Sequence, residues 1–292
     1  MGTGEAGEVS GKTVAITETV RDAWQGLPKL VPTAAKIAHV QRLLDEGFAS
    51  IDIGSFVSPK AVPAMADTGA LMEGLVVPDE ATIMALVANA RGLEQLLAHE
   101  RIDEVLFPFS LSETFQQRNT RCSREEALEQ VAALSERAHE GGRTMYVTVS
   151  MAFGNNEGDP FDPVELAHWL GRLEDAGADR LGLADTTAEA NGDLVRRVFA
   201  VVAAEHGGAV PAVHFHVTPE SQGELVAAAL DSGCREFDAA LGGLGGCQFA
   251  QGPESNVSTL PLVDQLQAAG FEHGLPLISL PALDEAAQLL AR

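Results

Sequence analysis

The segment from Thr144 to Leu183 reads TMYVTVSMAFGNNEGDPFDPVELAHWLGRLEDAGADRLGL and holds one complete strand–helix–strand unit. Thr144–Ser150 and Arg180–Leu183 are short runs of β-branched and apolar residues, which favour β-strands. The run between them, Pro163–Ala176, is amphipathic at helical spacing, and Gly177 follows it as a C-terminal glycine does. The segment therefore predicts two neighbouring strands joined by a crossover helix.

The same alternation runs through the whole chain. The other expected strands are Thr13–Thr17, Ser50–Ile53, Ile83–Val87, Glu104–Phe107, Ala212–His216 and Glu236–Ala240. The other expected helices are Thr33–Glu46, Ser123–His139, Asp193–Glu205 and Gln222–Ser232. Ser123 and Glu126 fit a capping box, and Gly47, Gly141 and Gly233 follow helical runs.

About eight such units, without a break in composition, predict an α/β fold with a (β/α)8 TIM barrel. The barrel is expected as a single domain over residues 13–292, after a disordered tail over residues 1–12. A doubly wound sheet is the alternative, but no GxGxxG sequence follows the first strand.

The composition is that of a globular protein with a large core. The 292 residues are 46% hydrophobic and 21% charged, with a formal net charge of −23. This charge argues against a nucleic-acid partner, because phosphate binding needs a basic surface. No apolar run approaches the roughly 18 residues of a membrane span, and the polar start of the chain does not fit a signal peptide. Three scattered cysteines fit neither a disulfide framework nor a CxxC site, so we expect a cytoplasmic protein with no membrane partner.

Polar residues gather where the strands of a TIM barrel end, which is where such folds place their chemistry. Arg21-Asp22 follows the first expected strand, where the pair could also be a surface turn. His214 and His216 lie two apart on one strand, so both imidazoles face the same way and favour a metal site. Asn256 could be a turn residue, a helix cap or an oxygen ligand. With Asp22 these residues offer two nitrogens and two oxygens, which suit Mg²⁺ or Mn²⁺ and leave Zn²⁺ open.

A glycine-rich stretch, GGLGGCQFAQG over Gly242–Gly252, follows the eighth strand and contains Cys247. Because glycine allows positive φ and a close backbone approach, the stretch could be a linker, a phosphate cradle or a mobile arm. It lacks the context of a P-loop or a dinucleotide fingerprint, and it stands between a barrel strand and an expected metal ligand. We interpret it as a hinged arm that carries Cys247.

These motifs together resemble the 3-hydroxy-3-methylglutaryl-CoA lyase family, which are metal-dependent TIM-barrel lyases related to the isopropylmalate and homocitrate synthases. The resemblance rests on Arg21-Asp22, SFVSPKAVPAM (Ser55–Met65), SETFQQRNTRCS (Ser112–Ser123), LADT (Leu183–Thr186), His214-Phe215-His216 and the glycine stretch with Asn256. It extends from about Val14 to Ala269, and FVSPK with GLGGC is specific to the lyase branch.

The resemblance implies a retro-Claisen cleavage of a 3-hydroxy acyl thioester, with the two histidines, Asp22 and Asn256 holding the cation. It also implies that Arg21 stabilises the developing enolate and that Cys247 protonates the enolate carbon. Asp52 and Asp185 match acidic positions of the family, where they would support the arginine or move the hydroxyl proton. A salt bridge to the arginine is the simpler interpretation of Asp52.

Substrate contacts are expected from Gln25, Ser55 and Lys60, and from Trp24 because it lies two residues beyond the expected metal ligand Asp22. Lys60 could instead cap a loop. Trp24 stands within the sequence Ala-Trp-Gln where the family usually has Gly-Leu-Gln, and its indole would narrow the pocket.

Two further positions depart from the family. Thr17 replaces a glutamate four residues before the arginine, and Glu18, one residue along the strand, is expected to point to the other face. Val217 replaces an aspartate beside the histidines. Because the metal set and Cys247 are kept, the departures favour related chemistry on a different substrate.

The leading hypothesis is a divalent-metal-dependent carbon–carbon lyase that acts on a 3-hydroxy-3-methylglutaryl-CoA-like thioester and releases acetyl-CoA and acetoacetate or analogues. An aldolase or condensing enzyme acting on a different 2-oxo or hydroxy acid is the alternative, and a silent barrel that binds a metabolite or partner protein is a third hypothesis. The expected partner is therefore a small acyl-CoA or a hydroxy or keto acid. The resemblance also implies a homodimer, and Pro281–Arg292 is amphipathic enough to pack on its own barrel or on a neighbour.

Overall fold

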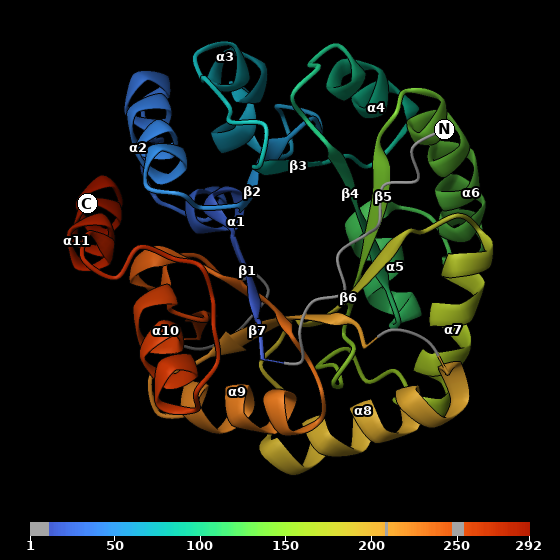
Figure 1. Cartoon of the computed structure of the whole chain (residues 1–292). Coiled ribbons are helices and arrows are strands. Elements are labelled where there is room, and N and C mark those ends of the chain that lie inside the picture. Colours follow the sequence, from blue (N-terminus) through green and yellow to red (C-terminus); the bar gives the residue numbers. More distant parts are fainter. Residues whose placement is uncertain (1–11, 208–209, 247–253) are drawn as a thin grey trace, which may run out of the picture.

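The computed structural model describes residues 12–207, 210–246 and 254–292. Its strands are β1 (Ala15–Glu18), β2 (Ser50–Ser55), β3 (Thr82–Leu86), β4 (Glu104–Ser110), β5 (Thr144–Ser150), β6 (Arg180–Asp185), β7 (Ala212–Val217), β8 (Glu236–Ala239) and β9 (Ser255–Asn256). Strands β1 to β8 are parallel, each pairs with its neighbours in sequence, and β8 pairs with β1. The sheet is therefore a closed barrel (Figure 1), which confirms the predicted fold and excludes the doubly wound sheet.

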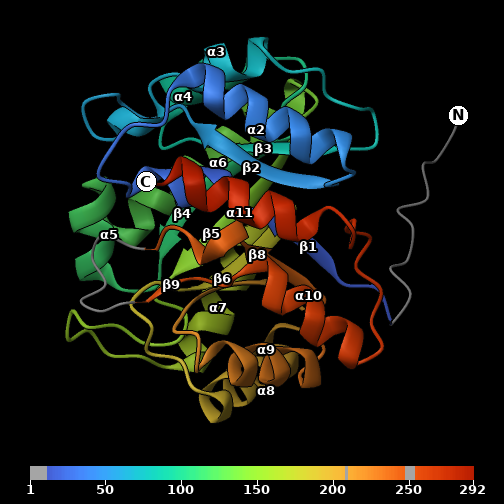
Figure 2. The same cartoon turned by 90° about the vertical axis from the view of Figure 1, so that its left-hand side faces the viewer.

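Most of the helices form a ring around the barrel, and α1 and α5 lie inside this ring (Figures 1 and 2). They are α1 (Val20–Gln25), α2 (Thr33–Asp45), α3 (Thr68–Glu73), α4 (Ala90–Leu97), α5 (Glu113–Thr120), α6 (Arg124–Glu140), α7 (Pro163–Asp175), α8 (Gly192–His206), α9 (Gln222–Asp231), α10 (Thr259–Ala268) and α11 (Leu280–Leu290), with short 3-10 turns η1 (Pro63–Met65) and η2 (Leu241–Gly243). The C-terminal helix α11 lies between α2 and α10 on the outside of the ring. Within the described part of the chain, no helix is both long enough and apolar enough to cross a membrane.

The local helix signals are largely confirmed. Ser123 and Glu126 form the predicted capping box at the start of α6. Gly177 follows α7 with φ +98°, in the left-handed region that favours glycine. Gly141 directly follows α6 as predicted, but it keeps φ −79°, and the left-handed conformation falls on Gly142 because α6 continues one residue further than expected.

The first residues of β4, β6 and β8 form an ion network at the N-terminal end of the barrel. The Arg180 guanidinium donates to Glu104 through Nη1 at 2.6 Å and to Glu236 through Nε at 2.8 Å. It also lies 4.0 Å from the ring centre of Tyr146 on β5. These contacts join three even-numbered strands across the barrel interior, as one layer of a TIM-barrel core does.

Candidate metal centre

The opposite, C-terminal end of the barrel brings together the residues predicted to bind a metal. Side chains alternate along β7, so His214 and His216 both face the interior. Strand β9 runs antiparallel to β7 and places Asn256 opposite His216. Asp22 comes from α1, directly after β1. One ligand atom from each of Asp22, His214 and His216 lies within 4.8 Å of the other two.

The two imidazoles are oriented so that their Nε2 atoms face each other. His214 Nδ1 lies 3.2 Å from Asp238 Oδ2, and His216 Nδ1 lies 3.0 Å from the carbonyl oxygen of Thr186. Because carboxylate and carbonyl oxygens accept, both Nδ1 atoms carry the proton, and the Nε2 lone pairs meet at 3.3 Å. Such a pair repels unless a cation or a proton lies between the two nitrogens.

The surroundings of the two histidines shift their pKa values in opposite directions. Burial lowers the pKa of His216 to about 4, and the neighbouring His214 adds to the effect. Burial also acts to lower the pKa of His214, but the hydrogen bond and charge of Asp238 outweigh it and raise that pKa. His216 is therefore neutral at pH 7, as a metal ligand must be.

The amide of Asn256 supplies a buried oxygen atom beside Asp22. Its Nδ2 group donates to Asp22 Oδ2 at 2.9 Å and to the carbonyl oxygen of Leu244 at 2.8 Å. Its Oδ1 atom is buried without a hydrogen bond among the described residues. A buried polar atom left unpaired is costly and calls for an explanation, which a bound cation would provide. Two nitrogens and two oxygens, one from an ionised carboxylate, fit a divalent cation.

Arg21 lies beside this centre and is held by two carboxylates. It contacts Asp52 Oδ2 through Nε at 2.9 Å and through Nη2 at 2.7 Å, and its Nη1 donates to Asp22 Oδ1 at 3.2 Å. Burial acts to raise the pKa of Asp22, but Arg21 and the two histidines lower it well below its usual range. Burial raises the pKa of Asp52 to about 6 against the opposing charge of Arg21. The salt bridge expected between Asp52 and Arg21 is therefore present.

Asp52 and Asp185 differ in what their oxygens contact. Asp185 accepts the backbone N–H groups of Glu189 and Ala190 at 2.9 and 3.1 Å, and burial raises its pKa to about 7. It thereby fixes the turn after β6, whose Thr186 carbonyl orients His216. Asp52 Oδ1, in contrast, is buried without a partner among the described residues.

Asp238 is a site residue that the sequence interpretation missed. It is buried on β8, and it holds His214 in the orientation described above. The sequence contained one signal, because Asp238 lies in the middle of the expected strand Glu236–Ala240, two positions after the acidic Glu236. Residues two apart on a strand face the same way, which indicates that both side chains face the barrel interior.

The expected substrate contacts lie at several places. Trp24 is 2% exposed and packs against His39 and Lys36 of α2, at 5.9 Å between ring centres and 5.7 Å from the Lys36 Nζ, so its burial does not support the predicted contact. Gln25 is half-buried and Lys60 is exposed. Cys247, the predicted acid, lies outside the described residues.

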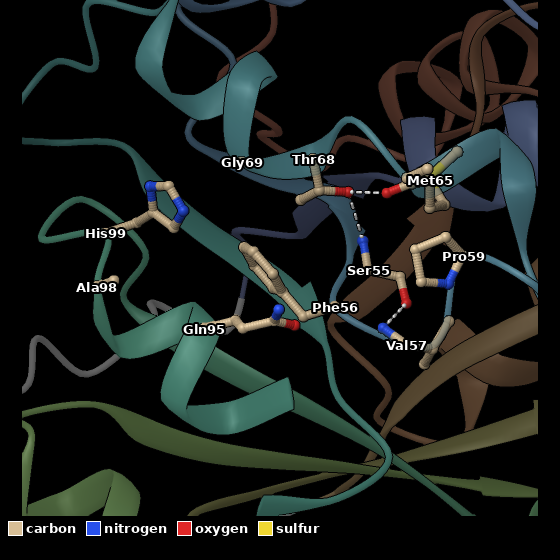
Figure 3. Close-up of a pocket in the computed structure, with 11 residues that line it drawn as sticks. Ser55, Phe56, Val57, Pro59, Met65, Thr68, Gly69, Gln95, Ala98 and His99 are labelled. Atoms are coloured by element: carbon tan, nitrogen blue, oxygen red, sulfur yellow. Dashed lines mark hydrogen bonds between the residues drawn. The ribbon is translucent and has the colours of Figure 1, made fainter. Parts of the chain in front are cut away.

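Ser55 borders a separate pocket of about 370 Å³ beside α3 and α4 (Figure 3). Its backbone N–H donates to Thr68 Oγ1 at 3.0 Å, and the Thr68 hydroxyl donates to the carbonyl oxygen of Met65 at 2.9 Å. Phe56 and His99 stack along the wall with ring centres 5.5 Å apart. None of the lining residues belongs to the metal set.

A carboxylate, an amide and two imidazoles thus converge at the C-terminal ends of the strands of a closed parallel barrel, which makes the fold an α/β barrel with a candidate cation site. A family model described as HMGL-like matches residues 13–286, and the chain belongs to this family.

Individual relatives agree with that family. A Pseudomonas aeruginosa protein, named 3-hydroxy-3-isohexenylglutaryl-CoA/hydroxymethylglutaryl-CoA lyase, is 32% identical over 261 residues, which cover 89% of this chain and 86% of that one. The crystal structure of the HMG-CoA lyase from Brucella melitensis has a TM-score of 0.91 at 34% identity and covers 96% of this chain and 99% of its own. An Acinetobacter baumannii HMG-CoA lyase, solved in complex with coenzyme A and 3-methylmalate, has a TM-score of 0.90 at 29% identity, covering 98% and 93%.

Proposed function

We propose that this chain is a divalent-cation-dependent carbon–carbon lyase that cleaves a 3-hydroxy-3-methylglutaryl-CoA-like thioester. The observation that carries the proposal is the convergence, beside Asp22, of two facing Nε2 atoms and Asn256 Oδ1, which has no partner in the described part of the chain. Lyases of the same family, about a third identical in sequence to this chain, indicate the class of reaction. The catalytic domain is proposed to span residues 13–292.

Asp22, His214, His216 and Asn256 would hold Mg²⁺ or Mn²⁺. When bound, the cation polarises substrate oxygens. The cleaved bond joins the thioester α-carbon to the hydroxyl-bearing carbon: the hydroxyl loses its proton, the bonding electrons pass into the thioester enolate, and the enolate carbon then gains a proton. The products are acetoacetate and acetyl-CoA, or their analogues.

The chain's own groups have distinct tasks in this scheme. Arg21, fixed by its two carboxylate contacts, would stabilise the negative charge on the thioester oxygen without reorganisation. Asp52 is better placed than Asp185 to accept the hydroxyl proton, because its Oδ1 has no partner among the described residues whereas both oxygens of Asp185 accept backbone N–H groups. Cys247 is proposed as the final acid by family resemblance alone.

The test is release of acetyl-CoA and acetoacetate from 3-hydroxy-3-methylglutaryl-CoA with Mg²⁺ or Mn²⁺, measured by mass spectrometry. His214→Ala should abolish turnover. The matched control is His139→Ala, which also removes an imidazole bound to a carboxylate, 2.7 Å from Asp179, but on α6. Equal rates in the two variants, or no metal-dependent turnover in the wild type, would contradict the proposal. Turnover of a free keto acid in place of the thioester would favour an aldolase.

We also propose a homodimer in a cytoplasmic compartment. Leu277, Ile278 and Leu289, at and beside α11, are large apolar residues with exposed fractions of 49%, 99% and 58%. A second chain on this face would cover them. Light scattering of the purified protein should give twice the mass of one chain, and a monomer at micromolar concentration would contradict the dimer.

A further inference from the structure

Two side chains from distant parts of the sequence bind consecutive backbone groups at the start of the glycine stretch. The Leu241 N–H donates to Glu18 Oε1 at 2.7 Å, and the Gly242 N–H donates to Asp284 Oδ1 at 2.6 Å. Glu18 is the last residue of β1, and Asp284 lies on α11. Both carboxyl groups are buried, with exposed fractions of 1% and 9%.

The backbone at this point needs such partners because it does not form regular structure. Gly242 and Gly243 have φ values of +71° and +60°, in the left-handed region. A buried N–H group outside a helix or sheet must find another acceptor. A Cβ added at Gly242 would come within 2.7 Å of Gln288 Cγ, so α11 packs directly on this turn. Gln288 in turn donates to Asp284 Oδ2 at 2.8 Å.

The same contacts lead to the metal centre. Two residues after Gly242, the Leu244 carbonyl oxygen accepts a hydrogen bond from the Nδ2 group of Asn256. Because Nδ2 points toward Leu244, Asn256 Oδ1 faces away from it. On the other side of Asn256, the Thr259 hydroxyl donates to Glu18 Oε2 at 2.8 Å. Glu18 thus joins the chain segments on both sides of the Asn256 amide.

We propose that Glu18 and Asp284 are positioning residues that fix Asn256 for cation binding through the turn at Leu241–Leu244. They touch neither substrate nor cation. The inference rests on the proposed function in one respect, namely that Asn256 is a metal ligand. It gives the C-terminal helix α11 a role in the centre that its place on the outside of the barrel does not suggest.

The test compares Mn²⁺ affinity, measured by calorimetry, with hydrogen exchange at the Leu241 and Gly242 amides. Glu18→Ala and Asp284→Ala should each weaken Mn²⁺ binding by about tenfold, the lower end of the effect of outer-shell partners. Both should also speed exchange at these two amides. Glu18→Gln keeps an acceptor for Leu241, and its amide N–H can donate to the Thr259 hydroxyl oxygen in place of accepting from it, so it should bind Mn²⁺ within about twofold of the wild type.

The matched control is Asp103→Ala. Asp103 Oδ2 likewise accepts a backbone N–H, from Ile83 at 2.8 Å, but at the N-terminal end of the barrel. This variant should leave Mn²⁺ affinity unchanged. If Asp284→Ala does not fold, Gln288→Ala, which removes only a donor to Asp284, should give a smaller loss of about threefold.

Unchanged Mn²⁺ affinity in the alanine variants despite faster exchange would overturn the inference, and so would an equal loss in Asp103→Ala. Failure of the proposed reaction gives a different result, because a wild type that binds Mn²⁺ but releases no acetyl-CoA leaves the positioning effect measurable. A wild type that binds no Mn²⁺ contradicts both.

Discussion

The two ends of the barrel interior use polar groups in opposite ways. At the N-terminal end, Arg180 has a carboxylate on each side and an aromatic ring beneath it. At the C-terminal end, two imidazole Nε2 atoms face each other across 3.3 Å and the Asn256 oxygen has no partner among the described residues. In the first arrangement the charged groups are paired within the chain, and in the second the polar groups need a ligand for their pairing. We infer that the polar groups at the N-terminal end stabilise the barrel, whereas those at the C-terminal end lower its stability and serve ligand binding.

The largest effect is expected when the C-terminal end loses one of its proposed metal ligands. His216→Ala should lower kcat/KM by on the order of 10³-fold, about 4 kcal/mol of transition-state stabilisation. The unfolding free energy in EDTA should hardly fall, because the variant also removes the repulsion between the imidazoles. Steady-state kinetics and urea denaturation measure the two quantities. A loss of stability as large as the loss of activity would make His216 a structural residue.

A substitution at the N-terminal end should have the opposite result, a loss of stability with little change in Mn²⁺ affinity. Arg180→Met leaves Glu104 buried without its counter-ion, which should lower the unfolding free energy by about 3 kcal/mol. The folded variant should bind Mn²⁺ within about twofold of the wild type. Urea denaturation and calorimetry give both values, and a matching loss of Mn²⁺ affinity would show that the two ends are coupled.

Cation binding should stabilise the protein through the C-terminal end only. Mn²⁺ at a hundred times its Kd should raise the unfolding free energy of the wild type by about 2.7 kcal/mol. The same increase is expected in Arg180→Met at its own hundredfold excess, and none in His216→Ala. Thermal unfolding with and without Mn²⁺ provides the comparison, and an increase in His216→Ala would place the cation elsewhere.

The smallest expected effect is on the pH dependence of the unfolding free energy, and it involves Glu18, next to the C-terminal end of the barrel. Burial raises the pKa of this carboxyl to about 8, from 4.5 for an exposed group. The folded state therefore holds the proton more tightly, so this stabilisation is full below about pH 4.5 and is lost as pH rises through about 8. Relative to Glu18→Gln, the wild type should lose unfolding free energy steadily as pH rises between about pH 5 and pH 9. Parallel pH profiles for the two proteins would show that Glu18 does not titrate in this range.

Much of the barrel could be predicted because its signals are local. A strand is recognised from a few consecutive residues, and the predicted run Thr144–Ser150 matches β5 at both ends. His214 and His216 could be identified as a pair because alternation along one strand fixes their common direction. Glu18 is likewise held by Leu241 and Thr259, away from the metal set, as the one-residue shift predicts.

The missed features all depend on contacts between distant segments. Asp238 becomes a partner of His214 only through the neighbouring positions of β7 and β8. Asp284 reaches Gly242 across 42 residues, and no motif marks either position. Trp24 was expected at the substrate because it follows Asp22 closely in sequence, but α1 is a short helix that turns this side chain toward α2.

The most direct test of the cation site is a crystal of the wild-type protein soaked in Mn²⁺, with data collected for anomalous differences. We expect one strong peak between His214 Nε2 and His216 Nε2, within bonding distance of an Asp22 carboxylate oxygen and Asn256 Oδ1. An anomalous map with no peak there, or with the cation bound at another cluster while these four side chains keep their present contacts, would contradict it.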